Sequence, residues 1–191
     1  DIRRSNISIR EIKMRLRKIK NAQNRLQENL GLFIPNPDEY KGSWQKKFGN
    51  KNPIYIEIGM GKGDFIIGMA KLYPNINFIG IEMFDSVMAR AVQKLEEENI
   101  PNLKLIRMDA LEINEVFGAE VDRIYLNFSD PWPKAKHEHR RLTSSRFLER
   151  YDLIFKNTPN IVMKTDNRKL FEYSIKSLTD YEYQINDISL D

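Results

Sequence analysis

The chain has no cysteine, which excludes disulfides, thiolate zinc sites and cysteine nucleophiles. It also lacks an apolar run of about 18 residues, so we expect no membrane span, and its basic N-terminus lacks the apolar segment of a signal peptide. We therefore expect a cytoplasmic protein with no membrane partner. Histidine is scarce, because His137 and His139 are the only two. With no third ligand near them, we expect no metal.

What is present fits one globular domain. The 191 residues are 41% apolar and 30% charged, which is enough to bury a real core. The net charge of +4 is uneven, since residues 1–25 carry nine Lys and Arg against two acids. Such a block favours a polyanion such as RNA, although a solvated helix face explains it equally well. We expect a basic helix or arm over 1–32, with apolar periodicity in 10–30, and one domain over 33–191.

From residue 53 onward the pattern alternates between strands and helices, after a loop predicted over 33–44. Strands are predicted over 53–59, 77–83, 102–110, 121–130, 160–166 and 182–191. Helices are predicted over 64–74, 86–100, 143–157 and 168–181, with caps at Ser86 and at Thr143 or Ser144. This order predicts a doubly wound, mostly parallel α/β sheet with helices on both faces.

The first strand runs into the glycine-rich turn "EIGMGKGDF", where Gly59, Gly61 and Gly63 allow a tight turn and a close ligand approach. A dinucleotide site requires G-x-G-x-x-G and a pyrophosphate at the helix start. Here Asp64 takes the place of the third glycine, and Glu57 adds a second acid. An acidic lining argues against a nicotinamide dinucleotide and favours a cationic ligand such as S-adenosylmethionine.

Four successive strand ends each supply an acid: Glu57, Glu82, Asp109 and Asp130. In a parallel sheet these ends meet along one ligand-binding edge. A carboxylate at Glu82 can accept ribose hydroxyls, and Asp109 or the neighbouring Ala110 can meet an adenine amino group. The four together predict an S-adenosylmethionine site.

The last of these acids opens "SDPWPKAKHEHRR". Pro131 and Pro133 stiffen the turn and hold Trp132 near the methyl donor. A planar side chain there is able to stack on a nucleobase, but a Trp folded into the core fits the sequence as well. The cations that follow Pro133 favour RNA.

The segments "EIGMGKG", "GIEMFDSV", "MDA", "YLNFSDPWPK", "HEHRRLT" and "KTDNRKLFEYS" occur in this order. Together they resemble the bacterial tRNA (guanine-N7-)-methyltransferase family over roughly residues 33–191. The resemblance implies a Rossmann-like class I methyltransferase fold that uses S-adenosylmethionine. It also implies tRNA as partner, with the guanine at position 46 of the variable loop as target, in a monomer or homodimer. The "D-P-W-P" turn is also similar to the loops of amino-methyltransferases, and a non-catalytic RNA-binding module stays open as a third function.

By the same resemblance, Asp130 is the catalytic acid, and Lys134 and Asp166 contact the substrate. The implied cofactor contacts are Glu57, Glu82, Asp109 and Asp130. The implied RNA contacts are Lys136, His137, Glu138, His139, Arg140 and Arg141. Family members carry a further T-x-Y-E motif and a final strand, and this chain stops at Asp191 before both. We therefore expect the last strand of the family fold to be missing from this chain.

Overall fold

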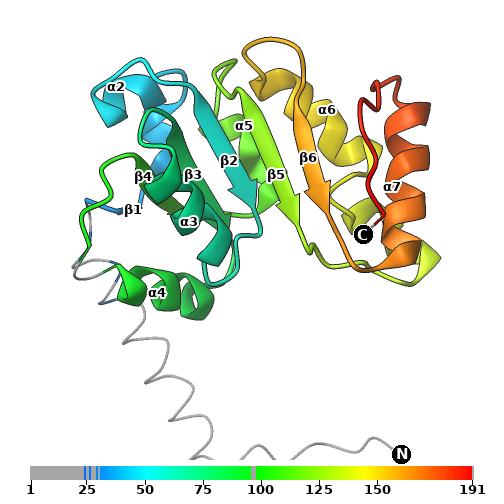
Figure 1. Cartoon of the computed structure of the whole chain (residues 1–191), viewed down its shortest axis with the longest axis horizontal. Helices are drawn as coiled ribbons and strands as arrows, with labels where there is room; N and C mark the ends of the chain where they lie inside the picture. The colour runs from blue at the N-terminus through cyan, green and yellow to red at the C-terminus, as the bar shows by residue number, and fades with distance from the viewer. Residues whose placement is uncertain (1–23, 25, 27–28, 30, 96–97, 191) are drawn as a thin grey trace, which may run out of the picture.

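The computed structural model describes residues 24, 26, 29, 31–95 and 98–190. Most of the predicted helix over 10–30 and of the basic arm lies outside these residues. The described chain contains a six-stranded sheet in the order β1-β4-β3-β2-β5-β6, and every pair of neighbouring strands is parallel (Figure 1). The strands are β1 (Phe33–Ile34), β2 (Ile54–Ile58), β3 (Asn77–Glu82), β4 (Leu103–Arg107), β5 (Arg123–Asn127) and β6 (Ile161–Lys164).

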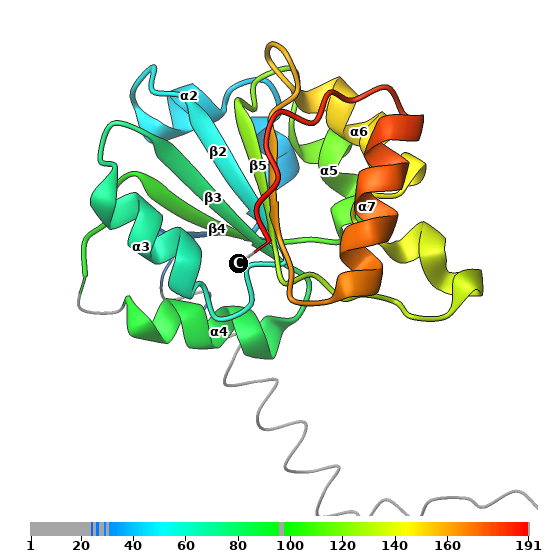
Figure 2. The ribbon, with the colours of Figure 1, turned by 45° about the vertical axis from the view of Figure 1, so that its right-hand side comes forward.

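Helices cover both faces of this sheet, as predicted. α3 (Asp64–Leu72) and α4 (Asp85–Lys94) lie on one face, and the other face carries most of the remaining helices (Figure 2). These are α2 (Trp44–Phe48), α5 (Ile113–Val116), α6 (Ser145–Ile154) and α7 (Arg168–Asp180). The described residues also form three short 3-10 helices: η1 (Pro37–Tyr40), η2 (Ala110–Glu112) and η3 (Ala135–Arg140).

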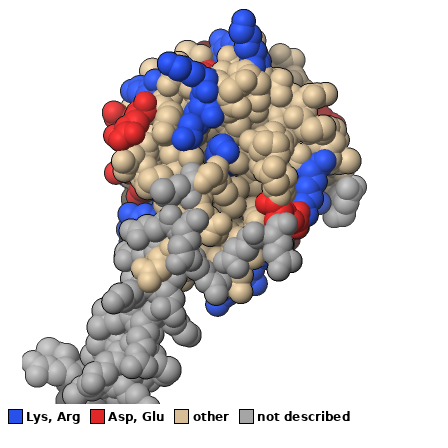
Figure 3. All heavy atoms as spheres, turned by 90° about the vertical axis from the view of Figure 1, so that its left-hand side faces the viewer, with Lys and Arg blue, Asp and Glu red and all other residues tan. Residues whose placement is uncertain are grey.

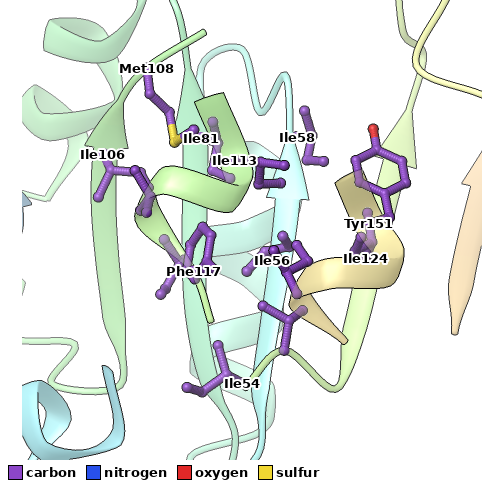
Figure 4. Close-up of a cluster of buried hydrophobic side chains, with 14 of the residues drawn as sticks. Ile54, Ile56, Ile58, Ile81, Ile106, Met108, Ile113, Phe117, Ile124 and Tyr151 are labelled. Atoms are coloured by element: carbon purple, nitrogen blue, oxygen red, sulfur yellow. The ribbon is translucent and has the colours of Figure 1, made fainter. Parts of the chain in front are cut away.

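The central strands are apolar on both faces because each face is covered. On β2, Ile54, Ile56 and Ile58 point to the same side and pack against α5 and α6, where Phe117 and Tyr151 complete the cluster (Figure 4). Side chains alternate along a strand, so Glu57 points to the opposite side, towards α3. A second cluster fills that side and includes apolar residues of α3, α4, β3 and β4.

Chain direction explains where a ligand can bind. From central β2 the chain moves outward through β3 and β4, and it later returns to the other side of β2 as β5 and β6. The order therefore reverses between β2 and β5. In open α/β sheets the ligand crevice lies outside the carboxyl ends of the strands at this point.

Two of the predicted element types are wrong. Phe33–Ile34 was expected in a loop but pairs with Leu105 and Ile106 of β4, because both residues are buried against the sheet. The strand predicted over 182–191 does not form in the described residues up to 190. The alternating apolar and polar residues there fit an extended chain, but no described strand pairs with them. The Tyr183 hydroxyl instead donates to Asp152 of α6.

The predicted helix starts at 64 and 168 are confirmed, but other predicted helix boundaries are wrong. α4 begins at Asp85 after Phe84, so Ser86 lies inside the first turn and is not the cap. The same helix ends at Lys94 rather than at 100. Ser144 occupies the N-cap position of α6, but its hydroxyl donates to the His139 carbonyl, and Thr143 pairs with Ser174.

Candidate active site

The glycine-rich turn crosses the carboxyl end of β2 in a conformation that needs its glycines. Gly59, Gly61 and Gly63 have φ values of 75°, 57° and 77°. The N–H groups of Gly59 and Met60 donate to the Ile81 carbonyl at 2.9 and 3.0 Å. The turn is thereby held against the end of β3, and α3 starts directly after it.

Gly63 also packs closely, which gives a test of the turn. A Cβ there would lie 3.2 Å from Ile67 Cδ1 and 3.3 Å from Ala91 Cβ, in a left-handed backbone. We expect Gly63→Ala to lower the free energy of unfolding by about 1–2 kcal/mol. The control is Gly68→Ala inside α3, where nothing lies within 4 Å, and which we expect to raise stability by about 0.5–1 kcal/mol. Urea denaturation measures the change in the free energy of unfolding for each variant. A change of the same sign in both variants would contradict this account of the turn.

Glu57 is a buried acid at the switch point. Its side chain is 2% exposed, and Oε1 accepts a hydrogen bond of 2.9 Å from the Asn127 side-chain amide at the end of β5. Oε2 is buried and has no hydrogen-bond partner among the described residues. Burial raises the pKa of Glu57 to about 7, although the Asn127 amide and the backbone of Ile66 oppose this shift. A carboxylate left in this state is a ready partner for a cation.

Glu82 is the last residue of β3, and its carboxylate connects the glycine-rich turn to the residues after β3. Oε2 accepts from the Gly61 N–H at 3.1 Å, and Oε1 accepts from the N–H groups of Met83 and Phe84 at 2.8 and 3.1 Å. The carboxylate is therefore fixed in position by backbone donors. Oε2 accepts only one of these hydrogen bonds and so keeps a lone pair free for a ribose hydroxyl.

Asp109 lies two residues beyond β4 and caps η2, where its Oδ1 accepts from the Leu111 N–H at 2.9 Å. Ala110 follows as the first residue of η2. A hollow of about 280 Å³ opens here between the ends of β3 and β4. Its lining residues are Met83, Arg107, Met108, Asp109 and Glu112. The site thus extends from the Gly turn across the ends of two strands.

The loop after β5 is unusual in its backbone. Asp130 lies exposed three residues beyond β5, and the residues two positions before and after it both have positive φ, 50° for Phe128 and 43° for Trp132. Such values are rare for bulky residues and mark a backbone that its surroundings hold in place. Phe128 is 59% exposed at the same edge of the sheet.

Trp132 is not part of either buried core cluster. It is half-buried, and its ring contacts His137 of η3 with ring centroids 5.9 Å apart. The Arg140 guanidinium lies 4.8 Å from the ring centre of Trp132. Trp132 is therefore not in the core, and its ring instead contacts the imidazole of His137 and the guanidinium of Arg140.

The remaining predicted substrate and RNA contacts lie in residues 134–141 and just after the end of β6. Lys134 is exposed at the start of η3, and Asp166 is exposed just after β6. Lys136, Glu138, His139 and Arg140 are exposed, and His137 is half-buried. Arg141 differs from them, because it is only 9% exposed and its side chain is turned inward.

One polar residue at the site, Asn127, was missed from the sequence, and Arg141 was given a different role there. Asn127 reaches Glu57 across two neighbouring strands, and Arg141 donates to the loop that carries Trp132. The strand end "LN" before the predicted acid was the available signal for Asn127. The inward direction of Arg141 has no signal in a run of cations.

The part of the chain that the structure describes shows neither a metal-binding cluster nor a membrane-spanning helix. It contains no group of three or more His, Asp or Glu residues arranged to hold a metal. None of its helices is long and apolar enough to cross a membrane. At the β1 edge, the surface formed by described residues carries Lys and Arg with acids among them (Figure 3).

Asp64 was expected to repel a pyrophosphate. It is the first residue of α3, is exposed, and forms an ion pair with Lys94 of α4, whose hydrogen bond and charge lower the pKa of Asp64. The acid is therefore ionised but partly balanced.

Comparison with known proteins places this site in a family. A family model described as a putative methyltransferase matches residues 51–189. The tRNA (guanine-N(7)-)-methyltransferase of Bacillus subtilis (strain 168) is 52% identical over 179 residues, which cover 93% of this chain and 84% of that protein. The protein of the same name from Bacillus velezensis is 51% identical over 93% of this chain and 82% of its own length.

Among solved structures, the 16S rRNA (adenine(1408)-N(1))-methyltransferase of Catenulisporales acidiphilia, solved with its cosubstrate SAM, has a TM-score of 0.55 at 16% identity. The match covers 78% of this chain and 72% of that one. At this identity the likeness supports the fold alone, and it agrees with the parallel sheet and the two helical layers. On the sequence matches, the chain belongs to the tRNA (guanine-N(7)-)-methyltransferase family.

Proposed function

We propose that this protein transfers a methyl group from S-adenosylmethionine to N7 of guanine in tRNA, at position 46 of the variable loop. The observation that carries the proposal is Glu57 Oε2, a buried carboxylate oxygen at the switch point of the sheet to which no described residue donates a hydrogen bond. The family named above supports the reaction, because relatives about half identical to this chain carry that name.

The residues present fit S-adenosylmethionine. Its cationic groups match the unpaired oxygen of Glu57, and its ribose matches Glu82, which is fixed by three backbone donors. Its adenine matches the hollow that Asp109 lines. A pyrophosphate would instead meet the buried acid Glu57 directly before the turn, which disfavours a dinucleotide.

When bound, S-adenosylmethionine supplies a methyl carbon activated by a positively charged sulfur. Guanine N7 has a free lone pair, so no residue of this chain needs to remove a proton first. The guanine ring becomes positively charged as N7 is methylated. The carboxylate of Asp130 is placed at the same edge as Glu57 and stabilises that charge by electrostatic attraction.

We further propose that Asp166 accepts from the N1–H and N2–H groups of the guanine, and that Lys134 contacts O6 or a phosphate. Asp166 and Asp130 follow neighbouring strands, β6 and β5, so both lie along one edge of the crevice. The exposed cations of η3 then contact the phosphates around the target. Orientation of the base next to the donor contributes most of the rate enhancement.

The test is a methylation assay with radiolabelled S-adenosylmethionine and an unmodified tRNA transcript. We expect incorporation into the transcript and none into a matched transcript with adenine in place of guanine 46. Equal incorporation into both transcripts would overturn the assigned position. No incorporation, with no heat of S-adenosylmethionine binding in calorimetry, would favour a non-catalytic RNA-binding module.

A further inference from the structure

The buried guanidinium of Arg141 holds the backbone of the loop that carries Trp132. Nε donates to the Pro131 carbonyl and Nη2 donates to the Trp132 carbonyl, each at 3.1 Å. A guanidinium is planar and presents its donors in a fixed fork, so one side chain can fix two successive carbonyls. These are the carbonyls of the residues directly after Asp130.

The other side of Arg141 is anchored on α7. Its guanidinium carbon lies 4.2 Å from the ring centre of Tyr173, which gives a cation–π contact away from solvent. Two residues further on, Thr143 pairs with Ser174 at 2.7 Å, and the Ser177 hydroxyl donates to the Thr143 carbonyl. The chain around Arg141 is therefore fixed to α7 before the guanidinium reaches the loop.

The left-handed backbone of Trp132 explains why such a support is required. A bulky residue at φ 43° is strained by about 1–3 kcal/mol and keeps that conformation only when its surroundings enforce it. The Pro residues on both sides limit the loop but donate no hydrogen bond. Among the described residues, Arg141 donates both of the hydrogen bonds that these two carbonyls accept.

We propose that Arg141, seated on Tyr173, is a positioning residue for Asp130 and Trp132 and does not contact RNA. This departs from the sequence-based expectation, which grouped Arg141 with the RNA contacts. At 9% exposure the side chain has little surface left for a phosphate. Arg140, its neighbour, is exposed on the Trp132 ring and keeps the predicted RNA-facing role.

A fluorine NMR experiment tests the contact without using activity. The chain has two tryptophans, Trp44 and Trp132, so protein labelled with 5-fluorotryptophan gives two signals, assigned by loss of one in Trp132→Phe. Trp44 is fully buried in the core and reports whether the fold survives. We expect Arg141→Lys and Tyr173→Leu to shift the Trp132 signal and leave the Trp44 signal in place. Tyr173→Phe keeps the ring and should match the unmodified protein.

A kinetic measurement tests the consequence, and this arm rests on the proposed function. We expect Arg141→Lys to slow methyl transfer at saturating tRNA about 100-fold, because the reacting groups are misplaced. The charge-matched control is Lys156→Arg. Lys156 follows α6, and its N–H donates to the Val121 carbonyl just before β5, at the amino ends of the strands, so we expect an unchanged rate.

The two roles of Arg141 predict opposite results for the lysine variant. A phosphate contact is satisfied by lysine, so wild-type signals and rate in Arg141→Lys would overturn the proposal. The slope of log tRNA affinity against log salt concentration gives a further test. If Arg141→Ala lowered this slope by about one, a phosphate contact would be lost and the proposal overturned. A shifted Trp132 signal with an unchanged rate would also overturn it. If the unmodified protein transfers no methyl group, the proposed function fails while the fluorine result stands on its own.

Discussion

Replacing Asp130 with asparagine is expected to slow methyl transfer to tRNA by about 100- to 1,000-fold, the usual effect of removing one group that stabilises transition-state charge. The change keeps the size of the side chain and removes its negative charge, just where the guanine becomes cationic. Asp130 is exposed at the carboxyl edge of the sheet, so the substitution has little reason to disturb the fold. The measurement is a single-turnover rate with saturating cofactor and tRNA.

A matched change elsewhere separates chemistry from net charge. Asp180→Asn removes an exposed acid at the end of α7 whose ion pair with Lys176 is solvent-exposed and worth little. We expect the wild-type rate for this variant. An Asp130→Asn rate within a few fold of wild type would mean that another group, such as Asp166, stabilises the charge.

The second large effect is expected at Glu57. Glu57→Gln removes the charge that would pair with the cationic cofactor, and the loss of one charged hydrogen bond corresponds to about 10- to 100-fold weaker binding. Binding to the unmodified protein should also depend on pH. Because the pKa of Glu57 in the free protein is about 7, cofactor affinity should be about tenfold weaker at pH 6 than at pH 8.

Calorimetry at the two pH values measures this dependence. The cofactor's own amine titrates in the same way with both proteins, so the difference between wild type and Glu57→Gln isolates the carboxylate. An equal pH dependence in both would show that Glu57 is not the partner of the cation.

The same burial predicts an effect on stability in the absence of cofactor. The folded-state pKa of Glu57 lies above its ordinary value of 4.5, so the folded protein binds the proton more tightly than the unfolded chain. The contribution of Glu57 to the free energy of unfolding is therefore largest below pH 4.5. It falls by about 3 kcal/mol in total as the pH rises towards 7. Glu57→Gln should lack this decline and be more stable than wild type at pH 8. Urea denaturation across this range checks it, and a variant less stable at pH 8 contradicts it.

Much of the fold follows from periodicity. The strands that begin at Ile54, Asn77 and Leu103 were predicted because each is a short apolar run bounded by turn residues. The failures share a cause, which is that a strand depends on its neighbour as well as on its own residues. Phe33–Ile34 is too short to recognise but finds the edge of β4, whereas the alternating residues after 182 find no such edge among the described strands.

The site was predictable in part for a similar reason. Strand ends converge in any parallel sheet, so acids such as Glu57 and Glu82 could be placed together from sequence. What each acid contacts could not, because the partners are backbone groups or side chains distant in sequence. Glu82 meets the Gly61 N–H, and Glu57 meets Asn127, 70 residues away. Arg141 shows the limit most clearly, since a cation facing inward has the same sequence signature as one facing RNA.

The most direct test of the central claim is the identity of the methylated nucleoside. An unmodified tRNA transcript is incubated with the protein and S-adenosylmethionine, digested to nucleosides and analysed by mass spectrometry against standards. We predict 7-methylguanosine, formed by the unmodified protein and strongly reduced with Asp130→Asn. A guanosine or adenosine methylated on its exocyclic amine would instead identify an amino-methyltransferase and contradict the account.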